Sequence, residues 1–330
     1  GNDVLRPWIV WPLRLGSRLL SAPWFEDHLY RFFRELNYPE PIEALWRARR
    51  RRLMERSAQK ITHIFANSRF TANLLEEAGV SEGAIEILTG GVAAERFANL
   101  PPAPDLRAAL GIPADRFVML TACRMVRKKG VDFLIDRMHE VVDAQPDAHL
   151  LLVGSGRHER RLRRAAAQTH VADRITFTGK IPHEEIAAYY SIADAFVLAS
   201  RVQIDPITGL RDAETMGRVL CEANAAGVPI VAARSGGIPS VIEDEVNGLL
   251  FEPDDVTSLL DALGRLRSDD RLATTLTSNG REAARERFDW SIIVREHKRC
   301  FEEVLPGVQV HPRPDRPPVQ GEVRVVLDAP

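Results

Sequence analysis

The feature that most constrains the fold of this chain is an alternation that begins at Arg116 and ends near Arg287. Short apolar runs suited to buried parallel strands alternate with amphipathic stretches of helical length, joined by loops that carry Gly or Pro. The expected strands are residues 117–122, 149–153, 175–178, 195–198 and 230–232, and the expected helices are 132–143, 159–168, 184–191 and 219–226. Because parallel strands need crossovers, which helices supply, this pattern predicts a doubly wound α/β domain.

The segment before this domain has a different pattern. Residues 1 to about 60 are rich in aromatic residues and arginine and are expected to be helical. The elements expected next are a strand at 61–66, a helix at 71–77 and a strand at 85–88. Pro101, Pro102 and Pro104 then predict a stiff linker.

The segment after the domain begins as helix and ends without regular structure. Helices are expected at 271–287 and 291–304. Residues 306–330 carry six prolines and little periodicity, which predicts an extended or disordered tail.

Charge and cysteine content exclude several classes of function. Lys and Arg total 44 against 46 Asp and Glu, so the net charge of −2 provides no overall field to attract nucleic acid. The three cysteines are isolated, which favours a reducing compartment and argues against a disulfide frame or a zinc site. The sequence shows neither a signal peptide nor an apolar run of the roughly 20 residues that span a bilayer. We therefore expect a cytoplasmic protein, at most peripheral at the inner face of a membrane.

Candidate ligand-binding residues follow the carboxyl ends of the predicted strands, where open α/β sheets bind their ligands. Arg124 and Lys129 precede Gly130 in one loop, and a guanidinium and an ammonium can together bind a diphosphate. The alternative is a solvated basic loop. In the next loop Gly154 and Gly156 let the backbone approach a ligand, although a strand-to-helix turn needs glycine in any case. This motif is not GxGxxG and does not indicate a dinucleotide cofactor.

Two carboxylates surround the start of the helix that follows strand 195–198. Glu214 is expected in the loop before the helix and Glu222 within its first turns. Carboxylates placed in this way can accept hydrogen bonds from vicinal hydroxyls, one pair on a sugar and one on a ribose, while the helix amino-terminus faces phosphates. Taken singly, each glutamate is more often a solvated or capping residue.

In their order along the chain, these motifs resemble those of the retaining glycosyltransferases of sequence family 4 (glycosyl transferases group 1). The motifs are residues 124–130, 154–156, 177–179, 193–200, 214–222 and 236–237, with 66–71, 90–92 and Phe97 upstream. The resemblance covers about residues 60 to 300. It implies an α/β protein of the GT-B fold, with two Rossmann-like domains facing across a cleft.

The resemblance also implies a division of the chain. Residues 1–110 would form an acceptor-side domain, and helix 288–305 would pack back onto it. Residues 111–287 would bind the nucleotide-sugar donor, and 306–330 would remain as a proline-rich tail. The family's amino-terminal half is longer and carries a glycine-rich loop that residues 1–60 lack, so the acceptor-side domain is expected to be incomplete.

A role for each candidate residue follows from the same resemblance. Glu222 would bind the ribose, and Glu214 would contact the donor sugar without acting as a nucleophile. Arg124 and Lys129 would bind the diphosphate. The remaining donor-binding positions would be Gly154, Thr215, Met216, Gly217, Arg218 and Val219 around the sugar and phosphates, and Lys180 and Ile181 beside the base. His28 is the candidate histidine on the acceptor side, and neither a metal nor another cofactor is expected.

The activity implied is retaining transfer of a hexose from a UDP- or GDP-sugar to a hydroxyl of a glycan or glycolipid, in polysaccharide or glycoconjugate biosynthesis. A non-catalytic nucleotide-sugar-binding or partner domain is an alternative, as is a GT-B sugar-nucleotide epimerase or phosphorylase. Thr215 stands where the family often has glycine. The arginine run at 47–52, with tryptophans nearby, would suit either a basic face for anionic lipid or a solvated helix.

Overall fold

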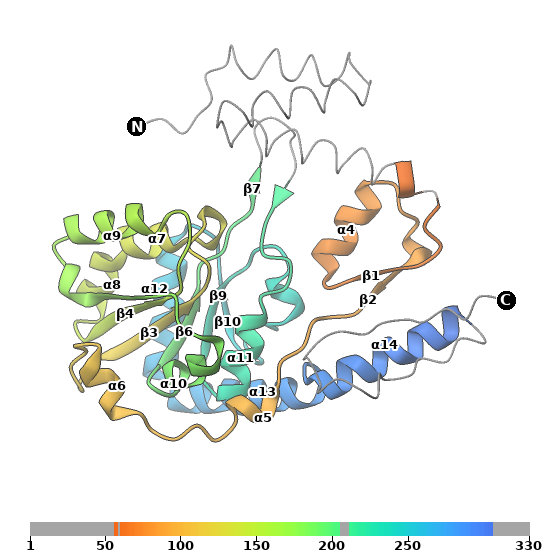
Figure 1. The fold of residues 1–330 in the computed structure, drawn as a ribbon. Coiled ribbons are helices and arrows are strands. Elements are labelled where there is room, and N and C mark those ends of the chain that lie inside the picture. Colours follow the sequence, from red (N-terminus) through yellow and green to blue (C-terminus); the bar gives the residue numbers. More distant parts are fainter. Residues whose placement is uncertain (1–55, 59, 205–210, 306–330) are drawn as a thin grey trace, which may run out of the picture.

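A computed structural model of the chain describes residues 56–58, 60–204 and 211–305, which form a large α/β unit and a smaller unit beside it (Figure 1). The large unit is built on a six-stranded sheet whose neighbouring strands all pair in parallel. Its strands, in spatial order, are β10 (Leu249–Phe251), β9 (Ile230–Ala233), β6 (Ala195–Leu198), β3 (Phe117–Ala122), β4 (Ala148–Val153) and β5 (Ile175–Gly179). The chain starts at the central strand β3 and builds outward in both directions, so the predicted doubly wound fold is confirmed.

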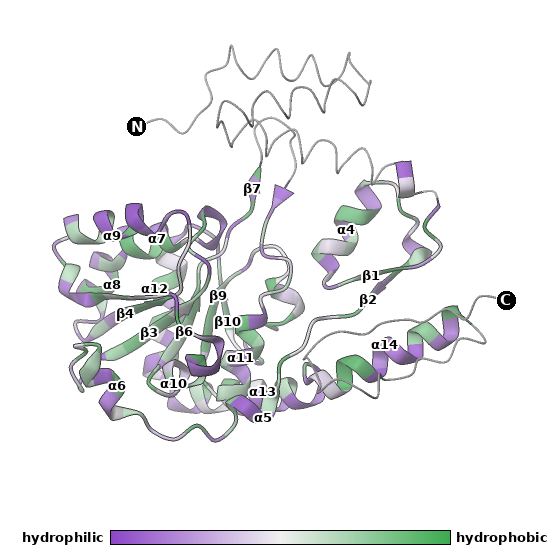
Figure 2. Cartoon of the chain, viewed as in Figure 1, coloured by the Kyte–Doolittle hydropathy of each residue, from purple (hydrophilic) through white to green (hydrophobic). Residues whose placement is uncertain are grey.

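Helices cover both faces of this sheet, and its strands are therefore apolar along nearly their whole length (Figure 2). One face packs against α7 (Val131–Asp136), α8 (Met138–Ala144), α9 (Glu159–Gln168) and α12 (Val256–Ser268). The other packs against α5 (Ala94–Phe97), α10 (Ile186–Ser191), α11 (Arg218–Ala226) and α13 (Asp270–Glu286). Alternate residues of β3 divide between the two cores, with Val118 and Leu120 in one and Met119 in the other.

The structure corrects three of the expected elements and adds others. The strand expected at 61–66 begins only at Ile64. The helix predicted at 132–143 is two helices, α7 and α8, which meet at Arg137. The linker prediction is wrong at Pro104, which is the first residue of α6 (Pro104–Ala109), because proline fits the first helical position, where its missing N–H has no helical partner. Strand β10, helices α5 and α12, and the short hairpin of β7 (Gln203–Ile204) and β8 (Arg211–Asp212) were not predicted.

The small unit has its own core. Strands β1 (Ile64–Ala66) and β2 (Ile85–Ile87) pair in parallel and are connected through α4 (Arg69–Glu77). Helix α14 (Trp290–Val304), from the other end of the chain, lies along this pair. The Phe65 ring is 5.2 Å from that of Phe301, and the Cys300 thiol donates a hydrogen bond to Glu86.

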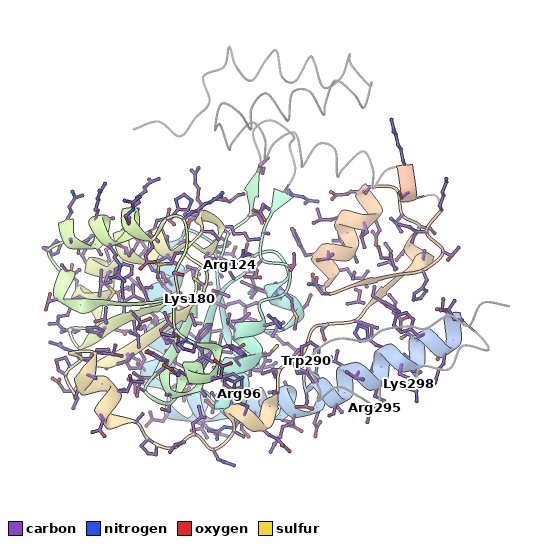
Figure 3. All side chains as sticks on the ribbon, viewed as in Figure 1. Arg96, Arg124, Lys180, Trp290, Arg295 and Lys298 are labelled. Carbon is purple, nitrogen blue, oxygen red and sulfur yellow. The ribbon has the colours of Figure 1, made fainter. Side chains whose placement is uncertain are left out.

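The chain passes between the two units at neighbouring points. The Val92 N–H donates to the Phe288 carbonyl, and the Trp290 N–H donates to the Val92 carbonyl. A Cβ at Gly91 would lie 2.7 Å from the Trp290 ring, so only glycine allows this close approach. Figure 3 shows Trp290 at this junction, beside the start of α14.

Two helical glycines provide opposite tests of the packing. A Cβ at Gly280 of α13 would lie 2.4 Å from the buried Asn224 side chain of α11, whereas a Cβ at Gly264 of α12 would meet no atom within 4 Å. We expect Gly280→Ala to lower the free energy of unfolding by about 1–3 kcal/mol through overpacking. Gly264→Ala should raise it by about 0.5–1 kcal/mol, since alanine is the better helix former. Urea unfolding of both variants measures this, and shifts of the same sign would contradict the packing described.

Candidate functional site

The predicted donor-binding residues come from the loops that follow β3, β4, β5 and β6 and from the start of α11. Because these strands are parallel, all four loops lie at the carboxyl edge of the sheet. The strand order reverses between β3 and β6, which makes the loops after these two strands the natural walls of a ligand site. They carry Arg124 and Lys129 on one side and Glu214 on the other.

An ion pair joins these two loops. The Lys129 ammonium contacts the Glu214 carboxylate, and the two side chains are only 10% and 13% exposed. Next to this pair, the Lys128 ammonium lies 2.8 Å from an Asp212 carboxylate oxygen. The turn that delivers both lysines ends at Gly130, which has a φ of 64° and whose Cβ would lie 1.8 Å from the Ala199 carbonyl oxygen. The positive φ and this close approach together require glycine.

The backbone before α11 is held by the turn that follows β9. The Gly237 N–H donates to the Glu214 carbonyl over 2.7 Å. A Cβ at Gly237 would lie 1.8 Å from the Thr215 carbonyl oxygen, and one at Gly236 would lie 2.3 Å from that of Glu214. These two glycines therefore bring the turn close enough to fix the backbone that carries Glu214.

The start of α11 presents backbone donors. Gly217 has a φ of 88° and precedes Arg218, the first residue of the helix, and no side chain caps the helix amino-terminus. Free N–H groups at such a terminus suit a phosphate. Val219 is half-buried and Arg218 is exposed, whereas Met216 is buried and its sulfur lies 3.1 Å from the Gly90 nitrogen.

Glu222 lies one turn into α11 and is partly buried. The Tyr190 hydroxyl of α10 lies 3.0 Å from Glu222 Oε2 and donates to it. Burial raises the pKa of the Glu222 carboxyl; the hydrogen bond and the positive charges of Arg218 and Arg96, with His183 when protonated, oppose this rise only in part. The fold therefore keeps a carboxylate at a place where ionisation is unfavourable.

The other residues predicted to bind the ligand at this edge of the sheet differ in their surroundings. The Arg124 side chain is exposed, and within the described ranges it makes no hydrogen bond or ion pair. Gly154 has a φ of 122°, and its Cβ would lie 2.1 Å from the Cys123 carbonyl oxygen, so the turn itself requires glycine there. Lys180 is exposed, and Ile181 packs partly against the core. Figure 3 labels Arg124 and Lys180 on the large unit.

Three contacts of this region were not predicted. The Tyr190 bond to Glu222 is one, and the Arg96 guanidinium bond to the His183 carbonyl, beside the loop after β5, is another. The third joins the two units, because the Asn67 side-chain amide donates to the Thr215 hydroxyl over 3.2 Å. The hydroxyl of Thr215, the residue that departs from the family pattern, thus accepts a hydrogen bond from the small unit. In the sequence, Tyr190 lies in an apolar helix, and this pattern indicates core packing but not a hydrogen bond to Glu222.

Some predictions fall outside the described residues, namely the helical structure expected up to residue 55, His28, the arginine run at 47–52 and the tail at 306–330. Within the described part of the chain, His, Cys, Asp and Glu side chains form no cluster of three that could hold a metal ion. Independence from metal stays a prediction. No helix among the residues with described structure combines the length and apolar character needed to cross a bilayer.

Comparison with known proteins bears on this site. Residues 103–283 match the family described as glycosyl transferases group 1. The chain is 37% identical over 227 residues to a GDP-mannose-dependent alpha-(1-6)-phosphatidylinositol monomannoside mannosyltransferase of Mycolicibacterium smegmatis, covering 68% of this chain and 57% of the relative. It is 31% identical over 245 residues to a D-inositol 3-phosphate glycosyltransferase of Xylanimonas cellulosilytica, covering 69% of this chain and 55% of the relative.

Solved structures agree with the fold. Anabaena Alr3699/HepE in complex with UDP superposes with a TM-score of 0.64 at 24% identity, covering 75% of this chain and 65% of that one. The predicted resemblance and the GT-B fold class are confirmed. The chain spans a little over half the length of the curated relatives it matches.

The raised pKa of Glu222 predicts that this residue lowers the stability of the folded state in a pH-dependent way. The folded state binds this proton more tightly than the unfolded chain, so the stability linked to it is present below the ordinary pKa of 4.5 and is lost as pH rises through the folded-state value. We expect Glu222→Gln, which keeps the shape without the charge, to unfold at higher denaturant concentration than wild type at pH 7. The gain should shrink towards pH 4.

Denaturant unfolding at both pH values measures this gain. Glu302→Gln, at an exposed position of α14, is the matched control and should show no such pH-dependent gain. A Glu222→Gln variant that gains more stability at pH 4 than at pH 7 would refute the unfavourable ionisation.

Proposed function

Because the chain belongs to the glycosyl transferases group 1, we propose that the protein transfers a hexose from a nucleotide-diphosphate sugar to a hydroxyl of a glycan or glycolipid. The observation that carries this proposal is the arrangement of Lys129, Glu214 and Glu222 around the start of α11. In this proposal Lys129 supplies a cation for the diphosphate, and the carboxylates of Glu214 and Glu222 accept hydrogen bonds from the hydroxyls of the sugar and of the ribose. Arg124, exposed in the same loop as Lys129, adds a second cation for the diphosphate.

The chemistry follows from charge. As the bond to the glycosidic carbon breaks, the leaving diphosphate gains negative charge and the sugar becomes positive. Lys129 and Arg124, placed in advance, stabilise the leaving group more in the transition state than in the ground state. Removing either cation is expected to slow transfer by about two orders of magnitude.

We assign Glu214 to orienting the donor sugar. Its carboxylate is paired with the Lys129 ammonium, which lowers its nucleophilicity and leaves its remaining lone pairs for sugar hydroxyls. This favours retention through attack on the same face as the departing diphosphate, with a phosphate oxygen taking the acceptor's proton. A covalent glycosyl-enzyme intermediate is not part of the proposal.

The preferred donor in this proposal is GDP-mannose, and the preferred acceptor is an inositol-containing glycolipid. The support is the 37% identical relative, whose name specifies that donor and a phosphatidylinositol mannoside. The same donor class suits the carboxylate pair, since both a ribose and a mannose present vicinal hydroxyls. The free state of all three cysteines accords with a cytoplasmic location, which we also propose.

A nucleotide panel tests the donor assignment. We expect calorimetry with GDP, UDP, ADP and their sugars to show the tightest binding for GDP-mannose. Glu222→Ala should weaken nucleotide binding by about tenfold, since hydrogen bonds to a charged group contribute roughly 1.5 kcal/mol or more. Glu302→Ala, far along the exposed face of α14, should bind as wild type does. The assignment fails if no nucleotide binds or if Glu222→Ala binds each one unchanged.

Product analysis separates the alternatives. A transferase releases GDP only when an acceptor hydroxyl is supplied. An epimerase converts the sugar nucleotide without an acceptor, and a phosphorylase depends on free phosphate. A non-catalytic binding protein would retain the donor with no turnover under all three conditions.

We further propose peripheral contact with an anionic membrane, supported by helix α9. Its inner side buries Leu162 and Ala166, and arginine occupies half of the remaining positions. Arg160 and Arg164 are exposed, one turn apart, and have no ion-pair partner in the part of the chain that the structure describes. The outer face of α9 is correspondingly hydrophilic in Figure 2. Because α9 follows β4, it begins at the same sheet edge as the donor site.

Vesicle binding tests this surface. Each arginine near an anionic bilayer contributes about 1 kcal/mol, so Arg160→Gln with Arg164→Gln should weaken partitioning roughly thirtyfold. The measurement is co-sedimentation with vesicles of phosphatidylcholine, alone or mixed equally with phosphatidylglycerol. Arg295→Gln with Lys298→Gln on α14 is the matched control and should bind as wild type (Figure 3). Unchanged binding of the α9 variant would exclude this helix as the contact.

A further inference from the structure

We propose that Tyr190 is a positioning residue for the donor nucleoside, whose hydroxyl holds the Glu222 carboxylate in the orientation that accepts both ribose hydroxyls. The proposal rests on the nucleotide-sugar function above and adds a residue from a different helix. Tyr190 lies in α10 and Glu222 in α11, 32 positions apart in the sequence. The two helices pack against each other on the same face of the sheet.

The tyrosine ring is held from two sides. Its side chain is almost completely buried, at 1% exposure. The Phe97 ring meets it edge-on at 5.6 Å, and the Phe196 ring lies 5.7 Å away on β6. A ring packed in this way cannot follow a moving partner, so the hydroxyl is a fixed point against which Glu222 is set.

The hydroxyl is directed at the carboxylate. It lies 3.0 Å from Glu222 Oε2 and 3.2 Å from the Val219 carbonyl oxygen. A hydrogen bond to a charged acceptor is the stronger kind, so the carboxylate is the favoured partner. Oε2 is then occupied on one side, which leaves Oε1 and the other lone pair of Oε2 for a ligand. Two such acceptors match the two vicinal hydroxyls of a ribose.

This bond matters because a glutamate on a helix is otherwise mobile. Fixing a free glutamate side chain costs conformational entropy, and binding would bear that cost at the moment when the ribose arrives. Because Tyr190 holds the carboxylate in advance, this entropy is lost when the chain folds and not when the ribose binds. Burial raises the pKa of Glu222, and the hydrogen bond from Tyr190 lowers it. The bond thus helps to keep the carboxylate ionised and available as an acceptor.

The adjacent residue provides a matched comparison. Tyr189 lies on the same helix and is also buried, but its hydroxyl has no hydrogen bond to Glu222 or to any other residue in the described ranges. If tyrosines of α10 served only to fill the core, removing either hydroxyl would have similar effects on ligand selection. The proposal assigns an effect to Tyr190 alone.

The experiment compares GDP with 2′,3′-dideoxy-GDP, which lacks both ribose hydroxyls, by calorimetry on the full chain. The measured quantity is the dissociation constant of 2′,3′-dideoxy-GDP divided by that of GDP. We expect Tyr190→Phe to reduce this ratio about three- to tenfold, in line with the loss of one hydrogen bond. Glu222→Ala should bring the ratio close to one, and Tyr189→Phe should leave it at the wild-type value.

The outcomes separate this proposal from the function on which it rests. If wild type binds neither nucleotide, both are overturned. If wild type binds GDP and Tyr190→Phe loses affinity equally for both nucleotides, Tyr190 is only structural and this proposal alone is overturned. As a second variant, 3-fluorotyrosine in place of Tyr190 keeps the hydroxyl and makes it a stronger donor. Its ratio should equal or exceed that of wild type, and a fall would count against the proposal.

Discussion

The Lys129–Glu214 ion pair joins the two loops that begin on either side of the reversal in strand order. An ammonium and a carboxylate so far removed from water must stay together, since breaking such a pair leaves a buried charge uncompensated. The loops after β3 and β6 are thereby held at a fixed separation. The position of the loop after β6 sets the position of the backbone before α11, against which the two glycines after β9 pack. It thereby also sets the position of Glu222 in that helix.

Much of the fold could be predicted because the sheet is covered on both faces. Strands such as β3 and β6 are continuous apolar runs, and their predicted bounds agree with the structure. Strand β10 has only three residues and lies at the sheet edge, which leaves too short a pattern to recognise. The break at Arg137 and the helical start at Pro104 depend on local backbone geometry that apolar periodicity does not encode.

The site was predictable only in part, for a different reason. Glu214 and Glu222 lie near a helix start that the sequence marks, so their placement could be anticipated. The hydrogen-bond partners of Glu222 and of Thr215 could not be anticipated, because each comes from an element distant in the chain. Tyr190 reaches Glu222 from α10, and Asn67 reaches Thr215 from the small unit. Hydrogen bonds of this kind depend on how packed elements face each other, which a pattern along one strand or helix does not specify.

The packing of α14 on the small unit bears on how the chain acquires its structure during synthesis. The bond between Cys300 and Glu86 spans 214 positions, and the aromatic contacts of Phe65 also wait for this last helix. A ribosome delivers the whole of the large unit before α14 emerges, and domains generally fold as units in the order in which they are made. Strands β1 and β2 precede the large unit in the chain, yet their contacts with α14 can form only after the large unit has been made.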